Sequence, residues 1–194
     1  MKKLLLLGAL LSTVAMSANI AEVRGGLDFS SGLANNGFEL AGEYRVPVAD
    51  SFEIGGGAAY RFNKLNRYYA TEVSGLHQVP IYFTARYNFK NFPEVTPYVK
   101  TNLGFSINSG KFKYSSLNIL GKTDYSEEIT FGSGLYYGVG SGIRYKNFTF
   151  DLSYNWISLD TKVKFNDGDL NYRTNKYTSH FGAYTIGVGY TFGL

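Results

Sequence analysis

The sequence contains no cysteine, only 4 prolines and 2 histidines, and only 18% charged residues among its 194 positions. The lack of cysteine excludes a disulfide scaffold and a lipoprotein anchor. The low proline count, together with 44% hydrophobic residues, excludes a disordered or collagen-like chain. Beyond the N-terminus, no run approaches the ~18 consecutive apolar residues of a spanning helix. The formal net charge of +4 falls to +2 without Lys2 and Lys3, which gives little support for nucleic-acid binding.

The N-terminus has the layout of a secretory signal peptide, which we expect to cover residues 1–18. Lys2 and Lys3 provide a positive start, residues 4–16 form an apolar core, and small residues follow up to Ala18. At ~1.5 Å per residue the core spans only about 20 Å of a ~30 Å hydrocarbon layer, too little for an anchor helix. Residues 19–194 have the length of one domain. We therefore expect an exported protein that is either soluble or crosses a membrane as strands.

From residue 21 onward, apolar and polar residues alternate with a period of two, the pattern of β-strands. Eight segments show it most clearly: 23–29, 38–46, 52–62, 79–89, 98–107, 135–145, 148–156 and 184–192. The short connections are 47–51, 90–96 and 146–147, and the longer ones are 31–36, 63–76, 108–130 and 158–180. Short turns that alternate with longer loops predict an all-β fold, an eight-stranded antiparallel up-and-down barrel.

The character of the polar face decides between a soluble barrel and a transmembrane barrel. A water-facing surface would normally carry many Lys, Glu and Thr side chains, whereas this face is rich in Gly and Ser. Small side chains suit the narrow lumen of an eight-stranded barrel. The alternating runs also have about the 9–11 residues that a tilted strand needs to cross a bilayer. The sequence therefore predicts a transmembrane β-barrel with its apolar face outward, and a soluble ligand-carrying barrel is the alternative.

The same alternation places a set of charged residues on the lumen face. They are Arg24, Asp28, Glu39, Glu43, Arg45, Glu53, Arg61, Arg86, Lys100, Arg144 and Asp151. Unpaired charges in a narrow, dry space are costly, so we expect interleaved ion pairs that brace and plug the barrel. The alternative is a charged constriction that selects ions in an open pore.

Two local patterns carry a family resemblance. One is GVGSGIRY at 138–145, followed after a turn by FDLSY at 150–154, and the other is the final run TIGVGYTF at 185–192. In these patterns and in its architecture, the chain resembles the small outer-membrane β-barrels of Gram-negative-type bacteria. This group includes the OmpA transmembrane domain, OmpX and the opacity proteins.

The resemblance implies an outer-membrane protein, monomeric, with both termini in the periplasm and in contact with outer-membrane lipid and lipopolysaccharide. It also implies a C-terminal signal to the barrel assembly machinery, carried by Thr185, Gly187, Tyr190 and Phe192. The chain departs from the family pattern by continuing past the aromatic residue with Gly193 and Leu194. Because members include anchors, adhesins, small channels and a few lipid-modifying enzymes, the resemblance does not by itself select an activity.

The long connections hold the predicted contact surface. The basic and aromatic residues on them suit host proteins, sugars or anionic lipopolysaccharide. A solvated loop with rim aromatics is the alternative. The candidates are Lys64, Arg67, Tyr68, Tyr69, Lys111, Lys113, Tyr114, Lys162, Lys164, Tyr172 and Arg173. We expect loops 108–130 and 158–180 to continue as protruding hairpins, the second turning at Asp167-Gly168.

The chemistry-bearing residues do not define an enzyme. His77 and His180 are expected at the outer rim, with Ser179, Glu127, Glu128 and Asp160 as neighbours, but no partner for a catalytic histidine is specified. The sequence predicts no catalytic residue, metal or cofactor. It favours a non-enzymatic surface protein that stabilises the membrane or adheres to a host surface ligand. A narrow porin-like channel and an outer-leaflet lipid-modifying enzyme are the alternatives.

Overall fold

The computed structural model describes residues 19–30, 34–65, 72–90, 92, 94–117, 123–166 and 172–193. Its strands are β1 (Ile20–Ser30), β2 (Ala34–Ala49), β3 (Phe52–Leu65), β4 (Glu72–Val73), β5 (Leu76–Asn88), β6 (Val95–Leu117), β7 (Thr123–Phe131), β8 (Gly134–Tyr145), β9 (Phe148–Asn166) and β10 (Tyr172–Gly193). Within the described residues, no helix is long and apolar enough to cross a membrane. The predicted signal peptide lies outside the described residues.

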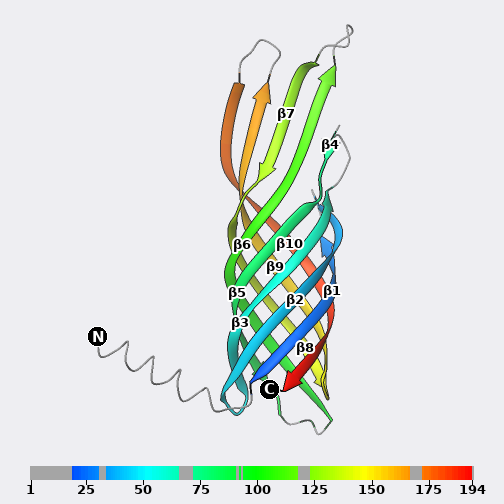
Figure 1. Ribbon diagram of the computed structural model, residues 1–194, viewed down its shortest axis with the longest axis vertical. Coiled ribbons are helices and arrows are strands. Elements are labelled where there is room, and N and C mark those ends of the chain that lie inside the picture. The colour runs from blue at the N-terminus through cyan, green and yellow to red at the C-terminus, as the bar shows by residue number, and fades with distance from the viewer. Residues whose placement is uncertain are drawn as a thin grey trace, which may run out of the picture.

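Eight strands close into a ring by antiparallel pairing (Figure 1). The order is β1, β2, β3, β5, β6, β8, β9 and β10, and β10 pairs back with β1 from Ile20↔Gly193 to Ser30↔Ala183. Both ends of the described chain therefore lie at the same end of the barrel, which we call the terminal end. The opposite end is called the distal end. The predicted eight-stranded antiparallel barrel is confirmed.

The two faces of the wall follow from the alternation of the sequence. Along β5, burial alternates strictly from Leu76 to Asn88, and Gln78, Thr84 and Arg86 are fully buried. Large apolar side chains cover the outside, with Leu103 65% and Leu135 61% exposed. Such exposure of apolar surface is costly in water and suits lipid. The wall therefore has a polar inner face and an apolar outer face.

At the distal end, four strands continue beyond the ring as a protruding sheet (Figure 1). It consists of the distal parts of β6, β9 and β10 together with β7, which pairs with β6 on one side and with β9 on the other. We call this the distal sheet. Much of the predicted connections 108–130 and 158–180 is therefore paired strand, as expected for protruding hairpins. The predicted turn at Asp167-Gly168 lies outside the described residues, as do Arg67, Tyr68 and Tyr69.

A register change separates β7 from β8. Pairing with both neighbouring strands shifts by one residue around Gly132 and Ser133, and the side-chain amide of Asn108 donates to the Gly132 carbonyl at 2.9 Å. An irregularity of this kind re-aims side chains. A regular strand would place Phe131 and Tyr136 on opposite faces, because their positions in the sequence differ by an odd number. The irregularity lets both side chains point inward.

The distal part of the lumen is apolar, which corrects the expectation of a small and polar lumen throughout. A cluster of buried side chains fills it, and its larger members are Leu76, Tyr82, Phe131, Tyr136, Ile157, Leu159 and Phe181. Val163 is also fully buried. The inward positions of β9 explain the change, because Asp151 and Asn155 give way to Ile157 and Leu159 on the same face. Sequence-based reasoning ended this strand at Trp156 and so missed its apolar half.

Close contact between strands makes some glycines obligatory, which gives a stability prediction. A Cβ on Gly55 would overlap the carbonyl oxygen of Tyr44 on the paired strand, whereas a Cβ on Gly42 meets nothing within 4 Å. We expect Gly55→Ala to lower the free energy of unfolding by about 1–3 kcal/mol. Gly42→Ala is expected to leave it within about 0.5 kcal/mol. Urea unfolding of the refolded barrel, followed by the fluorescence of Trp156, measures both, and equal effects would contradict the inferred packing.

Candidate functional site

All eleven charged residues predicted for the lumen lie on inward positions of the barrel wall. Ten are buried, and the side chain of Arg144, near the terminal end, is 22% exposed. Sequence-based reasoning missed a twelfth, Glu22, which is 2% exposed. It shares the parity of Arg24 and Asp28, so starting the predicted strand one residue earlier would have found it. Six acids and six bases therefore face the lumen among the described residues.

Glu43 on β2 is the centre of the ion-pair network. Its carboxylate lies 3.2 Å from Arg24 and 3.9 Å from Lys100, and it also pairs with Arg45. The Tyr82 hydroxyl donates a further hydrogen bond to it at 3.0 Å. One carboxylate thus receives groups from four strands, β1, β2, β5 and β6, which crosses the barrel from wall to wall.

Arg45 connects Glu43 toward the terminal end. Its guanidinium lies 2.7 Å from Glu22 and 3.0 Å from Glu53. Glu53 in turn accepts from Asn88 at 2.7 Å and lies 3.5 Å from Arg144. A planar guanidinium with five donors can serve several carboxylates at once, which explains why arginine dominates here.

Toward the distal end, the network continues through Arg24 and Arg61. Arg24 lies 3.1 Å from Glu39, and Arg61 lies 3.3 Å from Glu39 and 3.0 Å from Asp28. Asp28 accepts a hydrogen bond from Thr185 at 2.6 Å, which joins the first and last strands of the ring. The polar network therefore reaches the closing seam of the barrel.

A second branch runs along β6. Lys100 pairs with Asp151 at 2.8 Å, and the Tyr98 hydroxyl donates to the same carboxylate at 3.0 Å. The Arg86 guanidinium lies 3.9 Å from the centre of the Tyr98 ring, a cation–π arrangement, and 3.2 Å from Glu22. This branch closes the network into a layer that spans the lumen.

The layer excludes water at its centre. Arg45, Arg61 and Arg86 have 0% exposed surface, so no water-filled path runs beside them. The apolar cluster lies next to this layer, and the rings of Tyr82 and Tyr136 meet at 5.3 Å between the two. Ion pairs and packed apolar side chains thus close the same lumen in succession.

The two histidines lie on the outer surface rather than in the lumen. The Tyr60 hydroxyl is 2.7 Å from His77 Nδ1, and the Ser158 hydroxyl is 3.2 Å from His180 Nδ1. Ser179, the predicted neighbour of His180, instead accepts from Thr161 at 2.9 Å. The contact between Ser158 and His180 follows from the strand register, which places the two residues directly opposite each other. No group of three or more potential metal ligands occurs in the part of the chain that the structure describes.

The predicted contact residues that the structure describes lie on the distal sheet, apart from Lys64, which lies near the distal end of β3. Lys64, Lys111, Lys162, Lys164 and Arg173 are exposed, and Lys113 and Tyr114 are half-buried. Lys111 pairs with Glu128 at 3.0 Å, and its hydrogen bond lowers the pKa of this carboxyl. Tyr172 pairs with Asn166 at the distal end of the β9–β10 hairpin.

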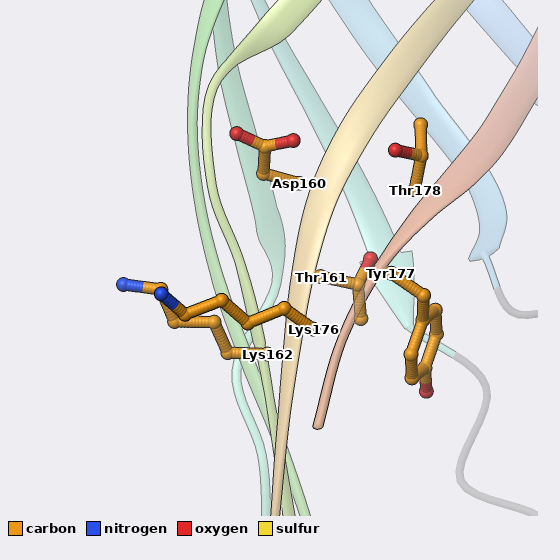
Figure 2. A pocket seen from close by; sticks show the side chains of 6 residues that line it. All are labelled: Asp160, Thr161, Lys162, Lys176, Tyr177 and Thr178. Carbon is orange, nitrogen blue, oxygen red and sulfur yellow. The ribbon is translucent and has the colours of Figure 1, made fainter. Parts of the chain in front are cut away.

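A shallow cavity of ≈ 440 Å³ lies between β9 and β10 in the distal sheet (Figure 2). Its lining comes from three consecutive cross-strand pairs: Asp160 with Thr178, Thr161 with Tyr177, and Lys162 with Lys176. The side chains of Lys162 and Lys176 project to the same side, and that of Tyr177 points away from them. The predicted set of contact residues did not include Lys176, although it lies directly opposite Lys162.

The residues of the predicted assembly signal lie on the closing strand. Thr185 and Gly187 face the lumen, where Thr185 bonds to Asp28, whereas Tyr190 and Phe192 face outward with ring centres 4.8 Å apart. Tyr190 pairs with Val23 and Phe192 with Ala21. The signal is thus part of the seam, and its role in assembly stays a prediction.

Comparison with known proteins identifies the fold. No protein-family model matches the chain. The outer membrane protein OprG of Pseudomonas aeruginosa superposes with a TM-score of 0.54 at 14% identity, covering 92% of this chain and 97% of OprG. A major outer membrane protein from Thermus thermophilus has the same TM-score and identity over 90% of this chain and 100% of its own. This chain has the fold of a small outer-membrane β-barrel.

One curated protein is similar in sequence. An uncharacterized protein of Pasteurella multocida is 27% identical over 135 residues, which cover 62% of this chain. The matched region spans about half, 52%, of that relative's length. These similarities show the fold of the chain and do not show its activity.

The central position of Glu43 gives a second stability prediction. Glu43→Gln leaves Arg24, Arg45 and Lys100 short of one buried negative charge, so we expect it to destabilise the barrel by about 3–5 kcal/mol. The control is Glu128→Gln, which removes a half-buried carboxylate of the distal sheet that pairs with Lys111, and it is expected to cost under about 1 kcal/mol. Urea unfolding in detergent micelles compares the two. Similar costs would mean that the lumen is hydrated and that its charges do not depend on one another.

Proposed function

We propose that the protein is a non-enzymatic surface protein of the bacterial outer membrane, exported by a signal peptide at residues 1–18. Its barrel acts as a sealed anchor, and its distal sheet, on the cell surface, stabilises the membrane or adheres to a host ligand. The barrel assembly machinery would insert it as a monomer, and its lipid partners are outer-membrane lipid and lipopolysaccharide. The apolar outer wall, the fold and the exposed basic residues of the distal sheet support this proposal.

The observation that carries the proposal is the closed lumen. A diffusion channel needs a continuous water path, and Arg45, Arg61 and Arg86 are fully buried across the middle of the barrel. Salt bridges join these arginines to Glu22, Asp28, Glu39, Glu43 and Glu53. The nitrogen–oxygen distances are 2.7–3.8 Å, except for the shorter contact between Arg45 and Glu43. With the interior filled, the surface left for an interaction is the outer wall and the distal sheet.

Planar-bilayer conductance of the refolded protein tests the sealed lumen. We expect no unitary steps in molar salt, because moving an ion past the buried pairs would require breaking several of them. A heat-dependent mobility shift of the same preparation shows that the barrel is folded. Sustained steps would overturn the proposal in favour of the narrow channel, with Glu43, Arg61 and Arg86 as its selectivity candidates.

A second candidate function, modification of outer-leaflet lipid, is favoured by one contact. The Ser158 hydroxyl and the His180 imidazole are within hydrogen-bond distance on the outer surface, the spacing of a nucleophile and its base. No contact between His180 and a carboxylate is found among the described residues, so the orienting acid of such a site is missing.

Fatty-acid release from lipid vesicles decides between the two functions. We expect the wild-type barrel in vesicles that contain lipopolysaccharide to release no fatty acid above the protein-free background. Release that Ser158→Ala or His180→Ala abolishes, and that Ser179→Ala retains, would establish the enzyme instead.

A further inference from the structure

Lysines line up across the outward face of the distal sheet. Strand register places Lys111 opposite Thr130, Thr130 opposite Lys162, and Lys162 opposite Lys176, so the four residues form one line across β6, β7, β9 and β10. All four are exposed. Neighbouring strands lie ~4.8 Å apart, so this lysine row covers about 14 Å. Lys113 and Lys164 lie on the adjoining line, which has Glu128 between them.

The pair Lys162 and Lys176 is unusual within this row. Like charges directly opposite each other in a sheet are destabilising, and both side chains project to the same side (Figure 2). Lys111 has Glu128 as its partner, but neither Lys162 nor Lys176 forms a salt bridge with any described residue. An anion from outside the chain would relieve this repulsion.

The position of the row, just beyond the apolar outer band of the wall, indicates which anion lies beside it. The outward face of β6 carries Leu103, Phe105 and Ile107 and then, four residues on, Lys111. The same face of β9 carries Phe150 and Leu152 before it reaches Lys162. The lysine row thus continues the lipid-facing wall beyond the apolar band. Its lateral neighbour is the head group of an adjacent lipid rather than a molecule that approaches the distal tip.

We propose that the lysine row binds the phosphate groups of phosphorylated saccharide lipid, the lipopolysaccharide type, in the surrounding outer leaflet. Two adjacent ammonium groups offer six donors to phosphate oxygens, and the Thr130 hydroxyl adds one more. Head groups that stand above the acyl chains match the height of the row, which lies beyond the apolar band. This inference rests on the proposed outer-membrane location and names the lipid chemistry that the distal sheet recognises.

Titration of the full-length barrel in zwitterionic detergent micelles tests the proposal. The probes are purified lipopolysaccharide, the same lipopolysaccharide with its phosphates chemically removed, and phosphatidylglycerol. Basic residues near an anionic lipid surface contribute about 1 kcal/mol each, so Lys162→Gln/Lys176→Gln is expected to weaken lipopolysaccharide binding roughly 30-fold. The control, Lys90→Gln/Lys146→Gln, removes the same charge from exposed positions at the terminal end and is expected to change binding less than about threefold.

A third variant separates binding from folding. Lys162→Glu converts the repulsive pair into an opposite-charge pair with Lys176, which favours the hairpin. It is nevertheless expected to lose lipopolysaccharide binding at least as far as the double glutamine variant. A heat-dependent mobility shift of each variant confirms the folded barrel.

Three results would overturn the proposal: equal loss in the control variant, unchanged binding after phosphate removal, or an equal loss toward phosphatidylglycerol. The last would make the row a general anionic-lipid surface. Conductance reports on the sealed lumen separately. Unitary steps combined with lysine-dependent binding would overturn the proposed function and leave this inference standing.

Discussion

Charges that point into an eight-stranded barrel must be neutralised by other inward side chains, because the interior is too narrow to hydrate them. This constraint ties the strands to one register. Arg24 meets Glu39 and Glu43 on the neighbouring strand, and Arg45 meets Glu53 on the next. A slip of one residue would turn every carboxylate of a strand toward lipid and leave its arginine partners unpaired. Such slips are therefore opposed on both faces of the wall at once.

Along a single strand, the outward face changes from apolar to polar and the inward face from polar to apolar. The change occurs where the strand passes from the lipid into water. On β9, the outward residues are apolar from Phe148 to Leu152 and become charged at Asp160 and Lys162. The inward residues change in the opposite sense, from Asp151 to Leu159. Within lipid the wall needs an apolar exterior and tolerates a polar interior whose charges form ion pairs. Beyond lipid the exterior is wet, and the interior becomes an ordinary apolar core.

This exchange explains what could be predicted from the sequence. The eight strands and the eleven inward charges follow from a period-two pattern with apolar residues outward. The same template ended β9 at Trp156 and β6 at Ile107, because beyond these residues the outward positions are polar and resemble a loop. Glu22 was missed for a smaller reason, since β1 was begun at Val23. The pairing of Ser158 with His180 depends on register, which alternation alone does not specify.

The continuity of the strands also fixes the positions of the exposed side chains on the distal sheet. Three strands, β6, β9 and β10, run without a break from the barrel into the distal sheet, so the positions of their exposed lysines are set by the wall beneath them. Side chains held at fixed spacing lose less entropy on binding than the same residues on a mobile loop. The pairing that closes the lumen thus also positions the outer surface. A sealed interior and an ordered distal sheet are two results of the same register.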